Sequence, residues 1–399
     1  MSGAYLDHAA TSPMPAAVRE AFLDALGLVG NPASTHGHGQ RAGEALESAR
    51  ERIAAALGGD RAETVLTAGG TEAINLAIKG VYWARRRAGA GPVVLIAEGE
   101  HHATLEAAEW LRDAQGAELA TLPIGAEGGL APEALAAAID RIGRERIALL
   151  SFLWANNEVG TVQPVARLCA IAEAAGIPAH VDAVSALGQV PVDFHASGAA
   201  ALSVSAHKIG GPVGVGALLL GRRTAAEPLL HGGGQQRARS GTQDVAGAVA
   251  FAAALENSQD PASPVRPRPE RIARMRALRD RLIAGIRGID PGAALRGPEP
   301  GGDADPRLPG NVHFTFPGCQ GDSLVFLLDA AGVSVSVGSA CRAGVAETSH
   351  VLLAMGVPEG AAAGALRFTF GAETRDSEVD ALLDALPDAL ARARAAGLS

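Results

Sequence analysis

Lysine is almost absent from this chain of 399 residues. Of its 34 basic residues only two are lysines, Lys79 and Lys208. A guanidinium stays protonated, whereas a lysine amine can lose its proton and condense with an aldehyde. Lys208 stands in SVSAHKIGGPVG, between a β-like run and a glycine-rich turn. A single lysine is usually an ordinary surface charge, but this setting indicates covalent chemistry.

Other scarcities exclude whole classes of protein. With only 4% aromatic residues, the core must consist of Ala, Val, Leu and Ile. A net charge of −9 argues against a general nucleic-acid binder. No apolar run is long enough to cross a bilayer, and the start, MSGAYLDHAATSP, has no signal-peptide pattern. The three cysteines, Cys169, Cys319 and Cys341, have no paired spacing, which predicts free thiols in a reducing cytoplasm.

Apolar runs alternate with helical patterns between about residue 60 and residue 220. This alternation predicts an α/β fold, with a mostly parallel seven-stranded sheet flanked by helices. We expect a large domain over 12–256 and a smaller α+β domain made of 1–11 and 257–399, with 257–269 (NSQDPASPVRPRP) as a linker. The expected strands of the large domain are 64–67, 93–97, 118–122, 147–152, 178–182, 201–204 and 215–220.

Polar residues follow several of these strands, where open α/β sheets bind ligands. In LTAGGTEAINLAIKG the strand leads through Gly70 and Thr71 into a helix, a pattern that offers N–H groups to a phosphate or is plain helix capping. Asp182 ends an apolar strand and could pair with a protonated ring nitrogen or cap a helix. His101 or His102 could stack on a flat ring or serve as a cap.

Cys341 lies in SVSVGSACRAGVAETS, a run of small residues between a strand and a helix. The neighbouring Arg342 favours the thiolate, so this cysteine is a candidate nucleophile. A lone cysteine is more often a small buried hydrophobe, and Cys169, within an apolar helical pattern, fits that alternative better. Cys319 stays undecided. A lysine, a phosphate site, a carboxylate and a histidine together are what pyridoxal phosphate needs, and a reactive thiol adds sulfur or acyl transfer.

The chain resembles the class V aminotransferase-like cysteine desulfurases, the NifS/IscS group. The resemblance runs through YLDHAATSPM, GNPASTHGHG, TAGGTEAINLAIKG, EHHATLE, NNEVGTVQPV, HVDAVSALG, SAHKIGGPVGVGAL, GGGQQRARSGT, GSACRAGVAETSHVL and LRFTFG. Ten such motifs in the family order cover nearly the whole chain. The resemblance implies the aspartate aminotransferase-like fold of enzymes that depend on pyridoxal 5′-phosphate. It also implies a long mobile cysteine loop, about 337–348, in the smaller domain.

The resemblance also implies a role for each matching residue. Lys208 would hold the cofactor, Asp182 would pair with its ring nitrogen, and His101 would stack on the ring. Cys341 would accept sulfur from L-cysteine as a persulfide, leaving L-alanine. The remaining expected contacts are Gly70, Thr71, Ser205, His207 and, from a second subunit, Thr242 for the phosphate; Asn157 and Ser185 for the hydroxyl side of the ring; and Asn31, Asn157 and Arg367 for the substrate. No metal site is expected.

The family resemblance further implies a cytoplasmic homodimer. It would pass sulfur to an iron–sulfur scaffold or to a thiolation enzyme, without binding nucleic acid or a membrane directly. Two features depart from the family pattern. Ser185 stands where a glutamine is usual, and the segment between GGG and RSGT is one residue shorter than usual.

Three other functions remain open. A selenocysteine lyase, or another class V enzyme, shares the fold and the cofactor. A nicotinamide-dependent enzyme is disfavoured, because GGPVGVG (210–216) follows Lys208 instead of joining a first strand to its helix. A desulfurase-like scaffold that only docks sulfur carriers is supported by Ser185 and the shortened segment alone.

Overall fold

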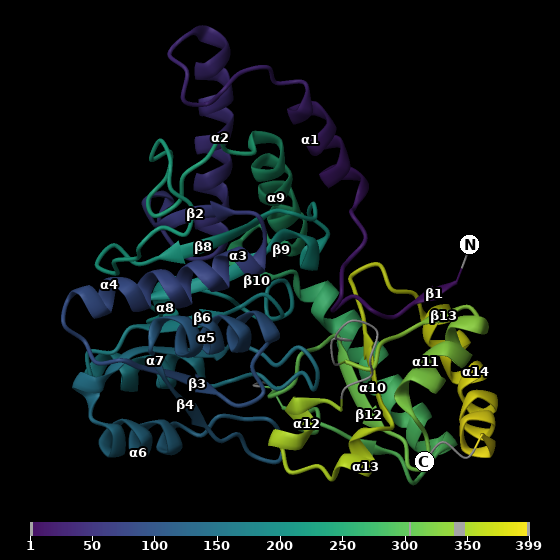
Figure 1. Cartoon of the computed structure of the whole chain (residues 1–399). Coiled ribbons are helices and arrows are strands. Elements are labelled where there is room, and N and C mark those ends of the chain that lie inside the picture. Colours follow the sequence, from purple (N-terminus) through teal and green to yellow (C-terminus); the bar gives the residue numbers. More distant parts are fainter. Residues whose placement is uncertain (1–2, 303–304, 339–347, 397–399) are drawn as a thin grey trace.

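The computed structural model describes residues 3–302, 305–338 and 348–396. Its centre is a seven-stranded sheet in the order β2-β8-β7-β6-β5-β3-β4 (Figure 1). β8 runs antiparallel to both of its neighbours, and all other neighbouring strands are parallel. The predicted α/β class and mostly parallel sheet are therefore confirmed. The strands are β2 Thr64–Thr67, β3 Val93–Ala97, β4 Glu118–Leu122, β5 Ile147–Leu153, β6 Ala179–Asp182, β7 Ala201–Ser205 and β8 Gly216–Leu220.

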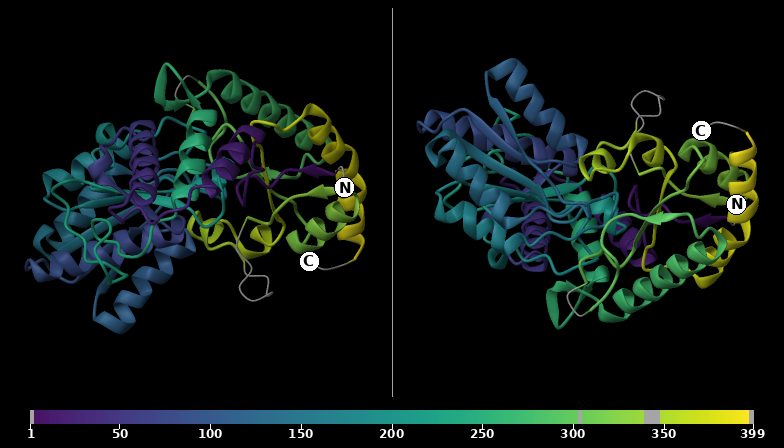
Figure 2. Two further views of the ribbon diagram at one scale, coloured as in Figure 1. Left: turned by 90° about the horizontal axis from the view of Figure 1, so that it is seen from above. Right: turned by 90° about the horizontal axis from the view of Figure 1, so that it is seen from below.

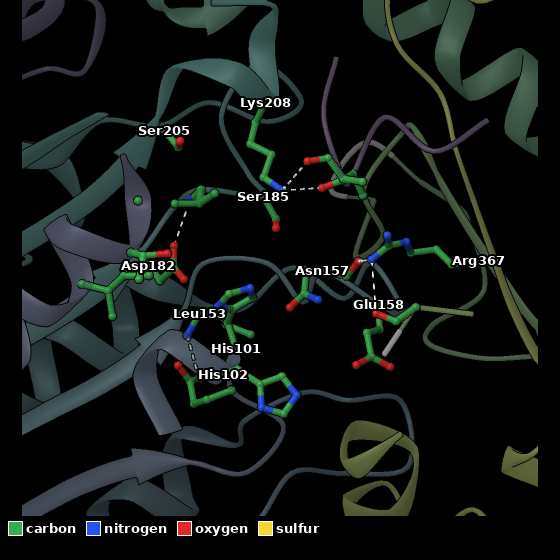
Figure 3. Close-up of a pocket in the computed structure, with 18 of the residues that line it drawn as sticks. His101, His102, Leu153, Asn157, Glu158, Asp182, Ser185, Ser205, Lys208 and Arg367 are labelled. Carbon is green, nitrogen blue, oxygen red and sulfur yellow. Dashed lines mark hydrogen bonds between the residues drawn. The ribbon is translucent and has the colours of Figure 1, made fainter. Parts of the chain in front are cut away.

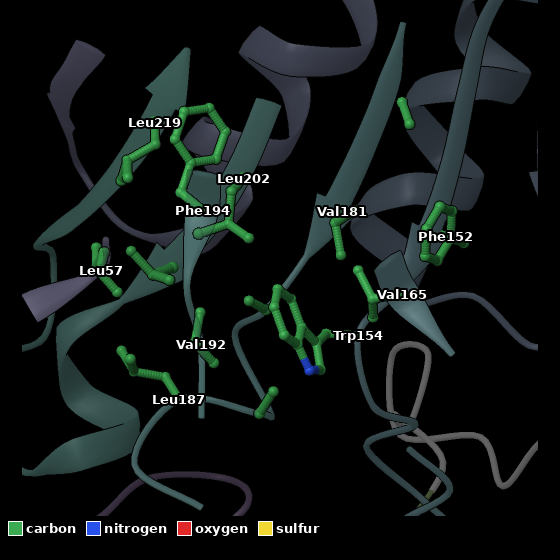
Figure 4. Close-up of a cluster of buried hydrophobic side chains, with 14 of the residues drawn as sticks. Leu57, Phe152, Trp154, Val165, Val181, Leu187, Val192, Phe194, Leu202 and Leu219 are labelled. Atoms are coloured by element: carbon green, nitrogen blue, oxygen red, sulfur yellow. The ribbon is translucent and has the colours of Figure 1, made fainter. Parts of the chain in front are cut away.

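The inner strands are buried along their whole length, as expected for a sheet with helices on both faces. The edge strand β4 buries only Leu122. Figure 4 shows the largest apolar cluster, in which Phe152, Val181, Leu202 and Leu219 come from neighbouring strands. The helices of this lobe are α1 Ala16–Leu26, α2 Gly37–Ala56, α3 Gly70–Asn75, α4 Val81–Arg87, α5 His102–Gln115, α6 Pro132–Ile142, α7 Val165–Ala174, α8 Phe194–Ser197 and α9 Val245–Ser258.

A second lobe has its own apolar core around a three-stranded antiparallel sheet. The sheet consists of β11 Ala294–Leu295, β12 Asn311–Thr315 and β14 Ala365–Thr369. β1 Ala4–Tyr5 pairs in parallel with β13 Val333–Ser334, so the N-terminal strand lies in the C-terminal lobe. Figure 2 shows the long helices of this lobe curving along its outer side. Its helices are α10 Pro269–Ile289, α11 Gly321–Ala330, α12 His350–Ala354, α13 Glu359–Ala362 and α14 Asp376–Ala395.

The structure differs from the sequence-based expectation in two places. The expected linker 257–269 is regular structure: α9 continues to Ser258, and β9 Gln259–Asp260 pairs with β10 Ser263–Pro267. This hairpin is fixed to the large lobe because the Val192 N–H donates to the Val265 carbonyl at 3.1 Å. The helix expected after Gly70 and Thr71 is divided by a π-helical turn, η2 Leu76–Gly80.

Short 3₁₀ turns complete the described structure: η1 Arg61–Glu63, η3 Arg144–Arg146 and η4 Ala206–Ile209. Within the described ranges, no helix has the length and apolar character needed to cross a membrane.

Candidate active site

A cavity of about 410 Å³ lies at the carboxyl ends of β5, β6 and β7 and receives residues from both lobes (Figure 3). This is the edge where ligands bind in open α/β sheets. The cavity brings together most residues that the sequence singled out. They are Gly70, Thr71, His101, Asn157, Asp182, Ser185, Ser205, His207, Lys208 and Arg367.

Lys208 extends into the cavity from η4, directly after β7. The αL conformation of the next-but-one residue, Gly210 (φ 82°), ends this turn. The Lys208 Nζ donates hydrogen bonds to the carbonyls of Ala9 and Ala10 in the N-terminal segment. Burial, and next the positive charge of Arg367, lower the pKa of Lys208 to about 8. A minor fraction of this amine, about one tenth, is therefore uncharged at pH 7.

Asp182 is the last residue of β6 and is 2% exposed. Its Oδ1 accepts a hydrogen bond from the Val184 N–H at 2.9 Å. Burial raises the pKa of Asp182 to about 6, against the opposing effects of that hydrogen bond and of Lys208. A cationic group placed beside this carboxylate would lower its pKa and stabilise the ionised form.

His101 is the N-cap residue of α5, and its Nδ1 accepts a hydrogen bond from the Ala103 N–H at 3.1 Å. The ring lines the cavity and is open to it. Burial, and next the charge of Lys208, lower the pKa of His101 to about 4. The ring is therefore neutral at physiological pH, with its proton on Nε2, and can stack on a flat ligand.

One corner of the cavity offers hydrogen-bond donors to an anion. Ser205 is 1% exposed, and its hydroxyl has no hydrogen-bond partner among the described residues. His207 and the start of α3, with Gly70 and Thr71, line the same cavity. A buried hydroxyl without a partner costs stability, so this corner suits a ligand that accepts hydrogen bonds.

Arg367 lies on β14, at the opposite side of the cavity in Figure 3. Its Nη1 donates to the Asn157 carbonyl and its Nη2 to Asp7 Oδ1, each at 3.0 Å. The Arg367 Nε is buried and has no partner among the described residues. This arrangement holds the guanidinium in place and leaves a donor for a carboxylate.

Three predicted residues are not part of this described cavity. Asn31 and Thr242 are exposed and do not line it in a single chain. Asn31 Oδ1 instead accepts a hydrogen bond from the Ala33 N–H. Cys341 lies outside the described residues.

The cavity also contains Glu100, Glu158 and His350, to which the sequence assigned no role, and His102, the alternative to His101 as the stacking or capping histidine. Glu100 and Glu158 are 1% and 2% exposed, and burial raises the pKa of both carboxyl groups. His102 and His350 lie at the same cavity with their ring centroids 5.0 Å apart. Glu100 directly precedes His101 in EGEHH, and Glu158 directly follows Asn157 in NNEVG. The sequence around these glutamates does not show that their carboxyl groups are buried, so neither was predicted.

Comparison with known proteins identifies the family. The model of the class V aminotransferases matches residues 4–382. An IscS-like cysteine desulfurase of Mycobacterium tuberculosis is 48% identical, and the match covers 99% of this chain and 98% of that protein. The chain belongs to the class V aminotransferases, among the IscS-like cysteine desulfurases. This family uses pyridoxal phosphate.

Two further matches agree with this assignment. The cysteine desulfurase IscS of Dictyoglomus turgidum is 39% identical over 96% of this chain and 93% of its own length. A solved NifS-like protein has a TM-score of 0.86 at 32% identity, covering 98% of this chain and all of that one. The aspartate aminotransferase-like fold that the motifs predicted is therefore confirmed by its NifS-like counterpart.

The residues of the cavity fit the cofactor of this family. Lys208 supplies an amine with a lowered pKa, Asp182 supplies a buried carboxylate, and His101 supplies a neutral ring. The Ser205 hydroxyl, which lacks a partner among the described residues, supplies a donor. Each of these groups meets a different need of a phosphorylated pyridine aldehyde.

Proposed function

We propose that this chain removes sulfur from L-cysteine, with Lys208 and Cys341 as its two reactive residues. The single observation that carries this proposal is the Lys208 amine, held in a cavity with Asp182 and His101 and with its pKa lowered to about 8. When bound, pyridoxal phosphate supplies an aldehyde that condenses with amines and a ring that accepts electrons.

In this proposal the residues around the cofactor bind and orient it. Asp182 pairs with the ring nitrogen and His101 stacks on the ring. The phosphate binds at Gly70, Thr71, Ser205 and His207, with Thr242 of a second copy completing the site. Asn157 lies on the hydroxyl side of the ring. Ser185, shorter than the usual glutamine, makes a weaker contact there.

The substrate carboxylate binds Arg367, whose Nε–H is a buried donor without a partner among the described residues. Asn31 contributes a second contact from across a subunit interface. The Lys208 Nζ, once free, accepts the proton from the substrate Cα, which its lowered pKa permits near neutral pH.

Sulfur transfer is the role of Cys341. Its thiolate attacks the substrate sulfur, and the carbon–sulfur bond breaks with its electron pair left on Cβ. Protonation of Cβ, and return of the proton held by Lys208 to Cα, give L-alanine. Cys341 then carries a persulfide. Selenocysteine is the alternative substrate, since the same carboxylate and amine contacts would hold it.

The persulfide then passes to a protein acceptor, an iron–sulfur scaffold or a thiolation enzyme. We propose that the chain acts as a homodimer in the cytoplasm. The unpaired spacing of its cysteines supports the cytoplasmic location.

Replacing Cys341 tests this function. Cys341→Ala should keep the visible absorbance of the bound cofactor and form no alanine from cysteine. After exposure to cysteine, mass spectrometry of the wild-type chain should find one added sulfur on the peptide that contains Cys341.

Cys319→Ala is the matched control, because this other cysteine of the second lobe is 3% exposed and lies in its apolar core. Its turnover should stay within about twofold of wild type. Normal alanine formation by Cys341→Ala would remove this residue from the reaction.

A further inference from the structure

Glu100 is a second carboxyl group at the end of the cavity occupied by Asp182. It stands between β3 and α5, directly before His101, and is 1% exposed. Glu100 Oε1 accepts a hydrogen bond from the Leu153 N–H at 2.9 Å, the dashed line that leaves Leu153 in Figure 3. Leu153 is paired with Asp182 across strands β5 and β6, so the two carboxyl groups approach the same strand ends.

The other oxygen of Glu100 is not satisfied. Oε2 is buried and has no hydrogen-bond partner among the described residues. The Thr104 hydroxyl, four residues further on in α5, lies beside this carboxyl group and lowers its pKa, an effect smaller than that of burial. It makes no hydrogen bond of ordinary distance and angle with any described residue. On the side of α12, His350 Nε2 lies 2.8 Å from the Glu100 backbone carbonyl and not from the carboxyl group. None of the described cationic side chains forms an ion pair with Glu100.

Two buried carboxylates that lie close together cannot both be ionised cheaply. Burial and then the charge of Asp182 raise the pKa of Glu100 well above its usual value. The positive charge of Lys208 stabilises the ionised form of Asp182, whereas none of the described cations forms an ion pair with Glu100. The shared charge therefore belongs on Asp182.

We propose that Glu100 is a positioning residue that stays uncharged, so that Asp182 carries the only negative charge of this carboxyl pair. Glu100 fixes the end of β5 through the Leu153 N–H, and its proton prevents a second charge that would drive Asp182 toward its neutral form. This inference rests on the proposed function only in the identity of the ring with which Asp182 pairs. The protonation state of Glu100 is a property of the chain itself.

Infrared spectroscopy of the full chain tests this assignment at neutral pH. The spectrum of wild type minus Glu100→Gln should contain the carbonyl band of a protonated carboxylic acid. Glu98→Gln is the matched control, because Glu98 is only partly buried and two residues away, and its difference spectrum should lack that band. A missing band in the Glu100→Gln difference overturns the proposal, whether or not the chain desulfurates cysteine.

The pH profile gives a second readout, which distinguishes a neutral Glu100 from an ionised one. Glutamine keeps the acceptor for Leu153 and has no charge, so Glu100→Gln should retain kcat/KM within about threefold. The acid side of its kcat/KM–pH profile, where activity falls as Asp182 is protonated, should lie at the same pH as in the wild type. If Glu100 were ionised, the substitution would remove a neighbouring charge, lower the pKa of Asp182 and shift the acid side of the profile to lower pH. Such a shift contradicts the proposal.

The assignment stays testable if Glu100→Gln does not fold. In that case the band is sought in Glu158→Gln, where the other buried glutamate of the cavity cannot contribute, before and after labelling the glutamate carboxyl carbons with a heavy isotope. A protonated buried glutamate gives a band that shifts on labelling. The absence of a shifting band overturns the proposal.

Discussion

Burial acts in opposite directions on the acid and the base at the centre of the cavity. It raises the pKa of Asp182 to about 6 and lowers that of Lys208 to about 8, because in both cases it disfavours the charged form. Between these values the carboxylate is ionised while a fraction of the amine is neutral. An ionised carboxylate can pair with a protonated pyridine nitrogen, and a neutral amine can accept a proton. Both groups are therefore in the form that the proposed function needs.

Buried histidines make the fold sensitive to acid. His313 on β12 is fully buried, and neither ring nitrogen has a hydrogen-bond partner among the described residues. Burial, and next the charge of Arg367, lower its pKa to about 3 from the ordinary value of 6.5. The unfolded chain therefore binds a proton below pH 6.5 that the folded chain does not. Stability is fully present above that pH and is lost as the pH falls.

Replacing His313 by leucine should reduce this acid sensitivity. Urea denaturation of the wild type should give a lower free energy of unfolding at about pH 5 than at about pH 7. In His313→Leu the slope should fall by about one proton, or about 1.4 kcal/mol per pH unit well below the unfolded pKa. The exposed His231 is the control, and His231→Leu should keep the wild-type slope. Equal slopes for both variants would contradict this account.

At the scale of elements, α12 depends on a single side chain at its start. The Ser349 hydroxyl donates to Glu158 Oε2 at 2.5 Å and accepts the Leu352 N–H at 3.1 Å. Ser349 thus caps the helix and also joins it to the loop that follows β5 of the large lobe. Val351 and Leu352 pack beside Val159 of that same loop.

Ser349→Ala should destabilise the chain by about 1–3 kcal/mol, because it removes a cap and leaves a buried carboxyl group without its donor. Denaturant unfolding measures this loss. The matched control is Asp244→Ala, which removes the cap that accepts the Gly247 N–H at the start of α9 but no hydrogen bond to a buried carboxyl group, and should cost about 1 kcal/mol. A cost for Ser349→Ala no larger than that of the control would show that the bond to Glu158 contributes nothing to stability.

Elements with one dominant signal were predictable from sequence. The runs VVLIA and IALLSF are continuous apolar segments, and they form the buried strands β3 and β5. The hairpin β9–β10 was missed because proline and serine normally mark loops. Its strands are short and its register is irregular, so β10 tolerates its prolines, and the anchoring bond comes from Val192, more than 60 residues away in sequence.

The position of a site residue was predictable where a motif indicated both the reactive residue and the strand end beside it. Asp182 ends one strand, and Lys208 and His101 follow two others whose ends lie nearby, and the structure brings the three residues together. Glu100 was not predictable, because its significance lies in an unsatisfied buried oxygen. Domain boundaries at 11/12 and 256/257 stay predictions.

At the scale of the whole molecule, a single chain exposes large apolar side chains on and just beyond α1. Leu23 and Leu26 on α1 are 59% and 58% exposed, and Val29 just beyond the helix is 76% exposed. Asn31 follows two residues later and does not line the cavity of its own chain. An exposed apolar stretch that adjoins a predicted site residue is what a subunit interface would leave in one isolated copy.

Placing charges on this stretch should separate the proposed dimer. Leu26→Glu combined with Val29→Glu would require desolvated carboxylates at an apolar interface, so light scattering should give the mass of one chain where the wild type gives two. The monomeric variant should also bind the cofactor more weakly, since Thr242 of the second copy would no longer reach the phosphate.

Phe326→Glu is the control, because Phe326 is 73% exposed on α11 in the other lobe. That variant should stay dimeric and keep its cofactor. If the double variant stayed dimeric with full cofactor affinity, the interface would lie elsewhere; a wild type of single-chain mass would mean that Asn31 and Thr242 act within one chain or not at all.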